Sequence, residues 1–349
     1  MKKLLLAPAL LPTVLLLTVF FLFPGGCSQR KLPALGPSNL VTIVTNLGTG
    51  DEAIATLKAA FTRPVISVEQ ESRYAFEVHG FGGLGRQRDA RNLVIVADMS
   101  RRDAVSRKAR EVLGREGIGE ILRRGAGWRV LPNIEALGQT MIVVAGRDRP
   151  SILRLLEAEA GELYASADSM ITERTGDMVY MHGEDAAMGR YLYAKYGWTV
   201  RIPKGYKAAE DPRTGVVKLV SADTQQPSRL FLAYWTASRS GALDREVCLR
   251  LRARLAWSYY DEDRIDPSST TVSEVTFQGR KALRIQGIWQ NEKHLIGGPF
   301  FTLCFLEKGR LYLLDGVVFA PGMDKSPWLR QIEAIMHTFK DSRKAVPAR

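Results

Sequence analysis

The chain is poor in the residues from which most recognisable active sites are built. It has three cysteines and four histidines in 349 residues. No cysteines have the CxxC spacing and no histidines the HExxH spacing of common metal sites. No G-x-S-x-G sequence marks a serine nucleophile. We therefore expect no cofactor and no metal, and no residue is predicted to be catalytic.

Long apolar runs are also scarce, because the only one that could span a membrane lies at the N-terminus. Lys2 and Lys3 precede an uncharged stretch from Leu4 to Phe23, which Pro24-Gly25-Gly26 separates from Cys27. A basic start, an apolar centre and small residues before a cysteine are typical of a lipoprotein signal peptide. We predict that residues 1–26 are removed and that Cys27 carries lipid, including palmitate.

Two alternatives to the lipoprotein signal remain open. The twenty residues from Leu4 to Phe23 approach the length of about 20 that spans a bilayer, so an uncleaved anchor would fit. Ordinary secretion is the other alternative. Pro8 and Pro12 disfavour a spanning helix, whereas Pro24 replaces the leucine usual in lipoprotein signals. Lipidation predicts a protein of the bacterial cell envelope that faces the periplasm and is attached to the outer membrane in preference to the inner one. Residues 27–38 would then be the lipidated cysteine and its tether.

The two remaining cysteines, Cys248 and Cys304, form an even pair that an exported protein could oxidise. A bridge would close a loop of about 57 residues, with an entropic contribution of about 4 kcal/mol. The alternative is a pair of buried thiols that act as small apolar side chains. Cys248 falls in a helical pattern and Cys304 in an apolar strand, which slightly favours the two thiols.

Positive charge is in excess and is concentrated in one region. The net charge is +12, and removal of the signal with its two lysines leaves +10. The basic region, Arg86–Arg129, holds twelve basic and six acidic residues. Such a region favours contact with anionic lipid or an acidic envelope protein, and the alternative is a solvated helix face. Nucleic acid is not expected, because no aromatic residue lies between Phe81 and Trp128 to stack on a base.

The apolar pattern predicts an α+β protein of two helix-on-sheet domains. Residues 39–197 alternate strand and helix signals, with a doubly buried strand at 91–97, a basic helix at 103–113 and a long helix from Pro150. Residues 198–342 indicate a mainly antiparallel sheet. Its strands are expected at 198–202, 216–221, 229–235, 272–277, 281–289, 299–306 and 310–319, with a helix at 244–259. Residues 343–349 form a basic tail.

The last predicted helix has the clearest pattern. Asp324 or Ser326 is expected to cap it, and Pro327 suits its first turn. An apolar stripe is then expected to pack on the antiparallel sheet. The stripe consists of Trp328, Ile332, Ile335, Met336 and Phe339.

An ordered set of short motifs in the second half resembles an uncharacterised family of bacterial lipoproteins known only as a domain of unknown function. The motifs are Gly287-Ile288-Trp289, Gly297-Gly298-Pro299-Phe300-Phe301, Gly316–Pro321, and Lys325 with Arg330–Ile335, preceded by Lys195–Trp198, Ile202–Tyr206, Arg91-Asn92-Leu93 and Leu32–Gly36. The likeness covers nearly all of the mature chain, but it is weak at 62–85, where an expected proline-rich segment is largely absent, and an expected aromatic strand is missing at 216–219. It implies a lipoprotein signal and an envelope location, and it assigns no activity.

The second half is also similar in architecture to Mog1/PsbP-like domains. This likeness rests on the segment from Trp198 to Tyr206 and on the final strand and helix. It concerns the order of elements and not a motif, so it implies a fold and no function.

The segment Trp289–His294 is the best candidate for a ligand-recognition rim. Trp289, Asn291, Glu292 and His294 place an aromatic ring, an amide, a carboxylate and an imidazole on one connection. The alternative, which we favour, is a hairpin connection in which Gly297-Gly298-Pro299 permits a bulge and a sharp re-entry.

Together these observations predict a lipid-anchored, non-enzymatic binding or assembly module of the envelope. One alternative is an envelope hydrolase that uses dispersed residues such as His182, Glu184 and His294. The other is a small-ligand carrier, which would need an apolar cavity between sheet and helices.

Overall fold

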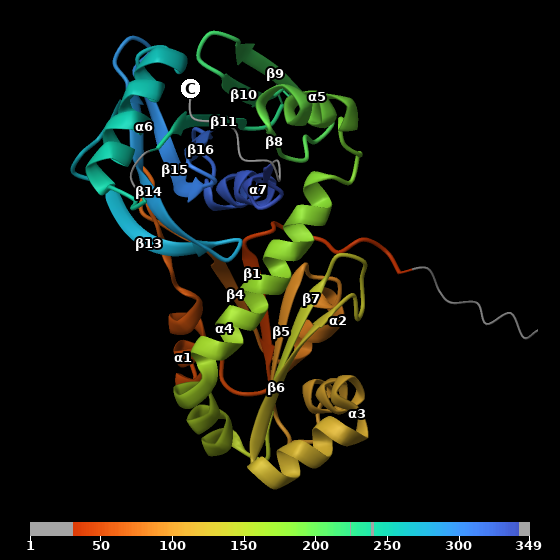
Figure 1. The fold of residues 1–349 in the computed structure, drawn as a ribbon. Helices are drawn as coiled ribbons and strands as arrows, with labels where there is room; N and C mark the ends of the chain where they lie inside the picture. The colour runs from red at the N-terminus through yellow and green to blue at the C-terminus, as the bar shows by residue number, and fades with distance from the viewer. Residues whose placement is uncertain (1–30, 224, 239–240, 342–349) are drawn as a thin grey trace, which may run out of the picture. The chain divides into compact units, whose positions relative to one another are not determined.

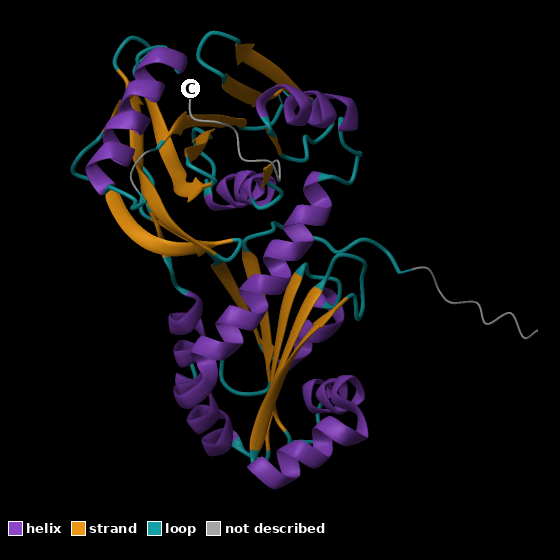
Figure 2. Cartoon of the chain, in the orientation of Figure 1, coloured by secondary structure: helices purple, strands orange, loops and turns teal. Residues whose placement is uncertain are grey.

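A computed structural model describes residues 31–223, 225–238 and 241–341 (Figure 1). It confirms the predicted α+β class, with one mainly parallel sheet, one antiparallel sheet and helices against both (Figure 2). The signal peptide, Cys27 and the basic tail at 343–349 lie outside the described residues. Of the helices within the described ranges, none is both long and apolar enough to cross a membrane.

The first sheet has five strands in the order β4-β1-β5-β7-β6. Their bounds are β1 Leu40–Thr45, β4 Ala75–His79, β5 Asn92–Asp98, β6 Ala126–Pro132 and β7 Thr140–Gly146. The first four in the order pair in parallel, and β6 pairs with β7 antiparallel. Every residue of β5 is buried, which confirms the strand predicted to be covered on both faces.

Helices cover both faces of this sheet. The helices are α1 Glu52–Phe61, α2 Leu84–Gln87, α3 Ala104–Arg124 and α4 Arg149–Val179, with a 3-10 turn at Phe81–Gly83. One core joins α1 and α4 to one face, and a second core joins α3 to the other. Asp51, Asp103 and Asp148 each cap the helix that follows, because each carboxylate accepts a backbone N–H of the first turn.

Two parts of the first half differ from the prediction. The helix expected at 103–113 continues to Arg124 after a kink at Gly114, whose φ of 63° and ψ of −173° are not helical. Glycine adopts this conformation without a Cβ clash, so the chain turns there and a second helical stretch begins. The strand β6 was not predicted, because Arg129 interrupts a short apolar pattern. Short strands β2 Pro64–Val65 and β3 Glu71–Ser72 pair with each other.

The second sheet has eight antiparallel strands in the order β12-β14-β15-β16-β11-β10-β9, with β13 also pairing with β14. Their bounds are β9 Tyr206–Asp211, β10 Val216–Ser221, β11 Ser228–Ala237, β12 Arg264–Ile265, β13 Thr271–Phe277, β14 Arg280–Asn291, β15 Ile296–Glu307 and β16 Arg310–Phe319. The strand β9 was missed. The strand predicted at 198–202 is only β8, Trp198–Thr199, which pairs with β17, Lys340–Asp341, outside the large sheet.

Helices α6 (Arg245–Tyr259) and α7 (Ser326–Met336) pack on opposite faces of the second sheet. The predicted stripe of α7 is confirmed, because Ile332, Ile335 and Met336 are buried in the core. Gly316 of β16 makes this approach feasible. A Cβ there would lie 2.7 Å from Ile332 Cγ2, so a larger residue would force the Ile332 side chain or the helix to shift.

The start of α7 is capped differently from the prediction. Neither Asp324 nor Ser326 caps it, and the residue at the N-cap, Lys325, makes no side-chain cap. The Glu71 carboxylate accepts the backbone N–H groups of Lys325 (2.8 Å) and Ser326 (2.6 Å) instead. A residue 255 positions earlier therefore supplies the negative charge that favours a helix N-terminus.

The domain boundary near Gly197 stays a prediction. Helix α5, Ala186–Tyr196, lies on its amino-terminal side and ends at Gly197, whose φ is 75°. Leu192 of α5 is nevertheless buried in the core of the second sheet. Between the two sheets, Arg330 of α7 donates to Asp168 and Thr172 of α4.

Candidate functional site

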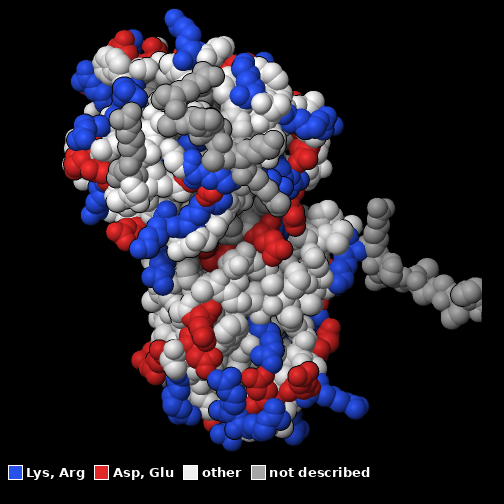
Figure 3. Space-filling view, viewed as in Figure 1, with Lys and Arg blue, Asp and Glu red and all other residues white. Residues whose placement is uncertain are grey.

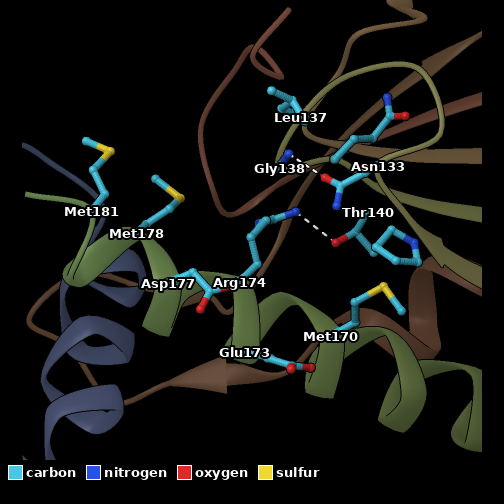
Figure 4. Close-up of a pocket in the computed structure, with 12 residues that line it drawn as sticks. Asn133, Leu137, Gly138, Thr140, Met170, Glu173, Arg174, Asp177, Met178 and Met181 are labelled. Atoms are coloured by element: carbon cyan, nitrogen blue, oxygen red, sulfur yellow. Dashed lines mark hydrogen bonds between the residues drawn. The ribbon is translucent and has the colours of Figure 1, made fainter. Parts of the chain in front are cut away.

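A cavity lies at the amino-terminal edge of the parallel sheet (Figure 4). It has a volume of about 530 Å³, within the range of small-molecule sites. One wall is the connection from β6 to β7, from Pro132 to Thr140, and the other is the end of α4 with Met181. We call it the Arg174 pocket. Its position is unusual, because ligands of parallel α/β sheets usually bind at the carboxyl edge.

Arg174 is the central polar residue of this pocket. It comes from α4, and its side chain reaches Thr140, the first residue of β7 (Figure 4), and Asn92, the first residue of β5. Nη1 donates to Thr140 Oγ1 (2.8 Å) and to the Arg91 carbonyl (3.1 Å), and Nη2 donates to Asn92 Oδ1 (2.8 Å). The guanidinium therefore ties α4 to the sheet edge through neutral oxygens only.

Arg174 carries a buried charge that no acid balances. The residue is only 8% exposed, and its Nε has no hydrogen-bond acceptor in the described part of the chain. No carboxylate among the described residues forms an ion pair with it. Burial, together with the charge of Arg91, lowers the pKa of Arg174 to about 10, so it remains protonated at neutral pH. An unbalanced buried cation is costly, and an acidic ligand group would reduce that cost.

The rest of the pocket combines an apolar wall with an acidic mouth. Leu137 is 50% exposed, and Met170 and Met178 are half-buried. Methionine adapts its shape to irregular apolar ligands. Glu173 and Asp177 are exposed at the mouth. The lining therefore suits a small organic acid with an apolar body and a hydrogen-bond donor at its other end.

Two of the four residues of the predicted ligand rim are inside the protein. Trp289 is buried and donates its indole N–H to the Val318 carbonyl, and Asn291 donates to Asp263 Oδ1 (2.8 Å). Glu292 and His294 are exposed, and they pair with Arg264 (3.0 Å) and Asp261 (2.7 Å). The structure thus separates the four side chains into two inside and two outside. The rim stays a prediction.

The favoured alternative for this segment, a hairpin connection, is confirmed, because β14 and β15 pair antiparallel on either side of residues 292–295. The bulge expected at Gly297-Gly298-Pro299 does not form. These residues continue β15 and pair in register with β14, from Gly297 opposite Gln290 to Pro299 opposite Ile288. Gly298 has a different role. A Cβ at Gly298 would lie 2.2 Å from the carbonyl oxygen of Val318 in the neighbouring strand β16. Glycine is therefore needed for this close approach of the two strands.

The residues considered for a hydrolase lie on separate segments. His182 is exposed beyond α4, and Glu184 pairs with Arg201. His294 lies on the turn between β14 and β15. No hydrogen bond or ion pair between described residues joins these three side chains. Among the described residues, no group of three or more His, Cys, Asp or Glu could hold a metal ion.

Cys248 of α6 and Cys304 of β15 are both buried and are both free thiols. The two thiols hydrogen-bond each other, and this bond and burial raise the pKa of Cys304 well above its ordinary value. Both cysteines belong to the same core, which is compatible with a disulfide and with a pair of buried thiols. A disulfide between them stays a prediction.

Basic side chains gather at the lower end of the molecule as viewed in Figure 3, with acidic ones among them. Within the basic region, Arg88 and Lys108 pair with Glu135, and Arg124 and Arg129 pair with Glu120. Arg107, Arg115 and Arg123 of α3 are exposed and appear in no ion pair of the described chain. The positive surface therefore lies over α3, with some acidic residues among the basic ones.

The sequence reasoning missed the Arg174 pocket, although one signal was present. Buried residues of α4 recur every three or four positions, from Ala160 and Leu163 to Ala167 and Ile171. Arg174 occupies the next position of this stripe. A charged residue at a position predicted to be buried indicates either an internal ion pair or a ligand site.

The C-terminal half matches a known family. Residues 185–338 match the family described as Domain of unknown function (DUF4837). This supports the expected likeness to a domain of unknown function, which assigns no activity. No curated protein matches the chain.

Two solved structures are similar at low identity. A crystal structure from Bacteroides thetaiotaomicron VPI-5482 aligns at 9% identity and a TM-score of 0.29, over 44% of this chain and 47% of that one. The solution structure of cyanobacterial PsbP (CyanoP) from Synechocystis sp. PCC 6803 aligns at 9% identity and a TM-score of 0.29, over 42% of this chain and 88% of that one. This chain thus spans about half the length of the first structure, and neither similarity carries a functional argument.

Proposed function

We propose that this protein is a lipid-anchored envelope protein that binds a small acidic amphiphile without converting it. The observation that carries the proposal is Arg174, a buried cation without an acidic partner in the described chain, which lines a pocket of about 530 Å³. The methionine-lined wall would hold the apolar part of the ligand. This combines the predicted binding module with the predicted small-ligand carrier.

Non-enzymatic binding is favoured by the chemistry of the lining. A general acid or base needs a group that gains or loses a proton near neutral pH. The pocket lining contains an arginine, two exposed carboxylates and amides, but no histidine, cysteine or lysine. This set can orient an acid and exclude water from it, which is sufficient for a carrier.

Filling the pocket should abolish ligand binding. Leu137→Trp would place an indole in the cavity without touching the core, since Leu137 is 50% exposed. We expect its affinity for a dansyl-labelled undecanoic acid to fall at least roughly tenfold, by fluorescence titration. The methyl ester of the probe should bind the unmodified protein roughly tenfold more weakly, since it loses a charge-assisted hydrogen bond.

Leu122→Trp is the matched control for the pocket variant, because Leu122 of α3 is 64% exposed and lies outside the pocket lining. It should bind the labelled acid as the unmodified protein does. Equal binding by both tryptophan variants would show that the probe does not use this pocket and would end the proposal.

Attachment to the membrane should depend on Cys27. The signal pattern predicts lipid on this residue, so Cys27→Ala should move the protein from the membrane pellet to the soluble fraction after cell lysis. Ser28→Ala is the matched control and should stay in the pellet. If Cys27→Ala protein carries no lipid, keeps its intact N-terminus and still stays in the membrane pellet, the result would instead support the uncleaved anchor.

The exposed arginines of α3 are proposed to contact anionic lipid. Charge reversal of Arg107, Arg115 and Arg123 to glutamate should weaken binding to phosphatidylglycerol vesicles roughly 100-fold, since each basic residue near such a surface contributes about 1 kcal/mol. The measurement uses protein that lacks residues 1–27 in a vesicle sedimentation assay, so that neither the lipid nor the apolar N-terminal segment contributes. Added salt should weaken binding of the unreversed protein.

The control for this surface makes the same change of charge elsewhere. Arg213, Arg250 and Arg264 are exposed residues of the second half. Their reversal should leave most vesicle binding intact. If both triple variants lose affinity equally, net charge and not the α3 surface governs the interaction.

A further inference from the structure

A second, smaller cavity lies between α7, strands β14 and β15, and the short strand β2. Its volume is about 90 Å³, which is room for roughly three water molecules at about 30 Å³ each. The polar part of its lining consists mainly of Arg73, Arg284, Arg330 and Glu333, and Phe300 and Phe301 form an apolar side. We call it the Arg330 cavity. It shares no lining residue with the Arg174 pocket.

The charges around this cavity do not balance. Asp168 accepts from Arg73 through Nε (2.8 Å) and Nη2 (2.9 Å), and from Arg330 through Nη1 (3.0 Å). Glu333 accepts from Arg284 Nη1 at 2.6 Å. Three guanidinium groups thus share two carboxylates in ion pairs, so one formal positive charge has no ion-pair partner of its own. The next carboxylate, Glu71, accepts the backbone N–H groups of Lys325 and Ser326 instead.

Arg330 provides a second, independent sign that the site is incomplete. The residue is 4% exposed, and its Nη2 has no hydrogen-bond acceptor in the part of the chain that the structure describes. Nη1 of the same group is fully used by Asp168 and Thr172. A buried donor on a charged group is costly when unpaired, so this nitrogen should have an acceptor in the protein in solution.

We infer that the Arg330 cavity binds a small tetrahedral oxyanion, such as inorganic phosphate or sulfate. An oxyanion would neutralise the excess charge and accept from Arg330 Nη2, and its other oxygens would face the remaining guanidinium N–H groups of Arg73 and Arg284. Arginine binds such anions by paired, charge-assisted hydrogen bonds. The two carboxylates already engaged by arginine would hold the guanidinium groups in place.

The test is the thermal unfolding midpoint of the purified full chain in millimolar phosphate or sulfate, against chloride at equal ionic strength. At this concentration the general effect of these anions on burial is small. Phosphate should raise the midpoint through preferential binding to the folded state. Arg330→Gln should lose this rise, with affinity weakened at least roughly tenfold.

Arg229→Gln is the matched control, because Arg229 is buried against the same helix and donates to Gln331 at 2.6 Å outside the cavity. This variant should keep the phosphate-dependent rise even if its midpoint in chloride is lower. An equal rise in Arg330→Gln would overturn the inference, as would the absence of any rise beyond chloride in the unmodified protein.

If Arg330→Gln does not fold, the inference can still be tested by a crystal structure of the unmodified protein, from crystals grown in phosphate. It should show an anion with an oxygen about 2.7–2.9 Å from Arg330 Nη2. Ordered water alone in the cavity would overturn the inference.

Discussion

Asp315→Asn is expected to lower the free energy of unfolding by about 3–5 kcal/mol, because it leaves a buried arginine without its counter-charge. Asp315 of β16 accepts from Arg252 Nε of α6 at 3.3 Å, and the two side chains are 3% and 1% exposed. Thr302 of the adjacent strand also donates to Asp315. The Arg252 guanidinium lies 3.6 Å from the centre of the Phe300 ring, so water cannot easily replace the lost carboxylate.

Urea unfolding of paired variants would separate the cost of an unpaired charge from the net contribution of the pair. The double variant Arg252→Met with Asp315→Leu should be much more stable than Asp315→Asn, since apolar replacement of a buried pair is often neutral. Glu292→Gln is the surface control, because its pair with Arg264 is exposed, and it should cost no more than about 1 kcal/mol. An equally small cost for Asp315→Asn would mean that the pair is not buried in solution.

Asp168→Asn is expected to cost about 3 kcal/mol at neutral pH, since it removes the acceptor shared by two arginines. Asp168 also accepts from the Tyr74 hydroxyl at 2.7 Å. Burial opposes ionisation of Asp168, but the hydrogen bond from Arg73 and the charges of Arg330 and Arg73 outweigh it and lower the pKa of this carboxyl. Arg73 and Arg330 also line the Arg330 cavity. Asp168→Asn should therefore also change the rise in unfolding midpoint that phosphate causes.

The pH dependence of stability gives the second part of this prediction. A carboxyl whose pKa is lowered in the folded state contributes its full stabilisation above its unfolded pKa of about 3.9. That contribution is lost as the pH falls through the folded pKa. Asp168→Asn should therefore lose less stability than the unmodified protein between neutral pH and acid. Glu333, whose pKa is lowered by Arg284 and Arg73 against the effect of burial, should keep part of the acid dependence.

Urea midpoints measured at a series of pH values would test this directly. Asp261→Asn is the control, because Asp261 is exposed and pairs with Lys293 and His294 at the surface. It should change both the midpoint and its pH dependence little. Parallel curves for Asp168→Asn and the unmodified protein, offset by a constant, would contradict the assigned role of Asp168.

The sequence predicts those parts of the fold that depend on local patterns. The stripe that includes Ile332, Ile335 and Met336 has helical spacing, and the structure buries these residues on the second sheet. The apolar run at 91–97 is recognisable as a doubly buried strand for the same reason. Alternation and turn residues likewise reveal most of the antiparallel strands. In each case the period of the pattern contains the information.

Features that depend on distant contacts could not be predicted in this way. The cap of α7 comes from Glu71, and no rule about neighbouring residues finds it. Trp289 looks like a surface aromatic beside polar residues, but its strand pairing places it inside. The interpretation of Gly297-Gly298-Pro299 as a bulge failed because the close approach of Val318 requires glycine within a regular strand.

The candidate site was the least predictable feature. The Arg174 pocket joins the connection before Thr140 to a part of α4 whose Arg174 lies 34 residues later in the chain. Only the packing of α4 along the sheet brings them together. Local reasoning could have noted that Arg174 occupies a buried position of its helix, but it could not have named Thr140 and Asn92 as its partners.

The central claim, that the Arg174 pocket holds a small acidic ligand, can be tested most directly on protein extracted from cell membranes in mild detergent. Native mass spectrometry should find one small acidic molecule per chain in the unmodified protein and in Leu122→Trp, and none in Leu137→Trp. The same bound molecule in Leu137→Trp, or no bound molecule in any of the three proteins, would contradict the account.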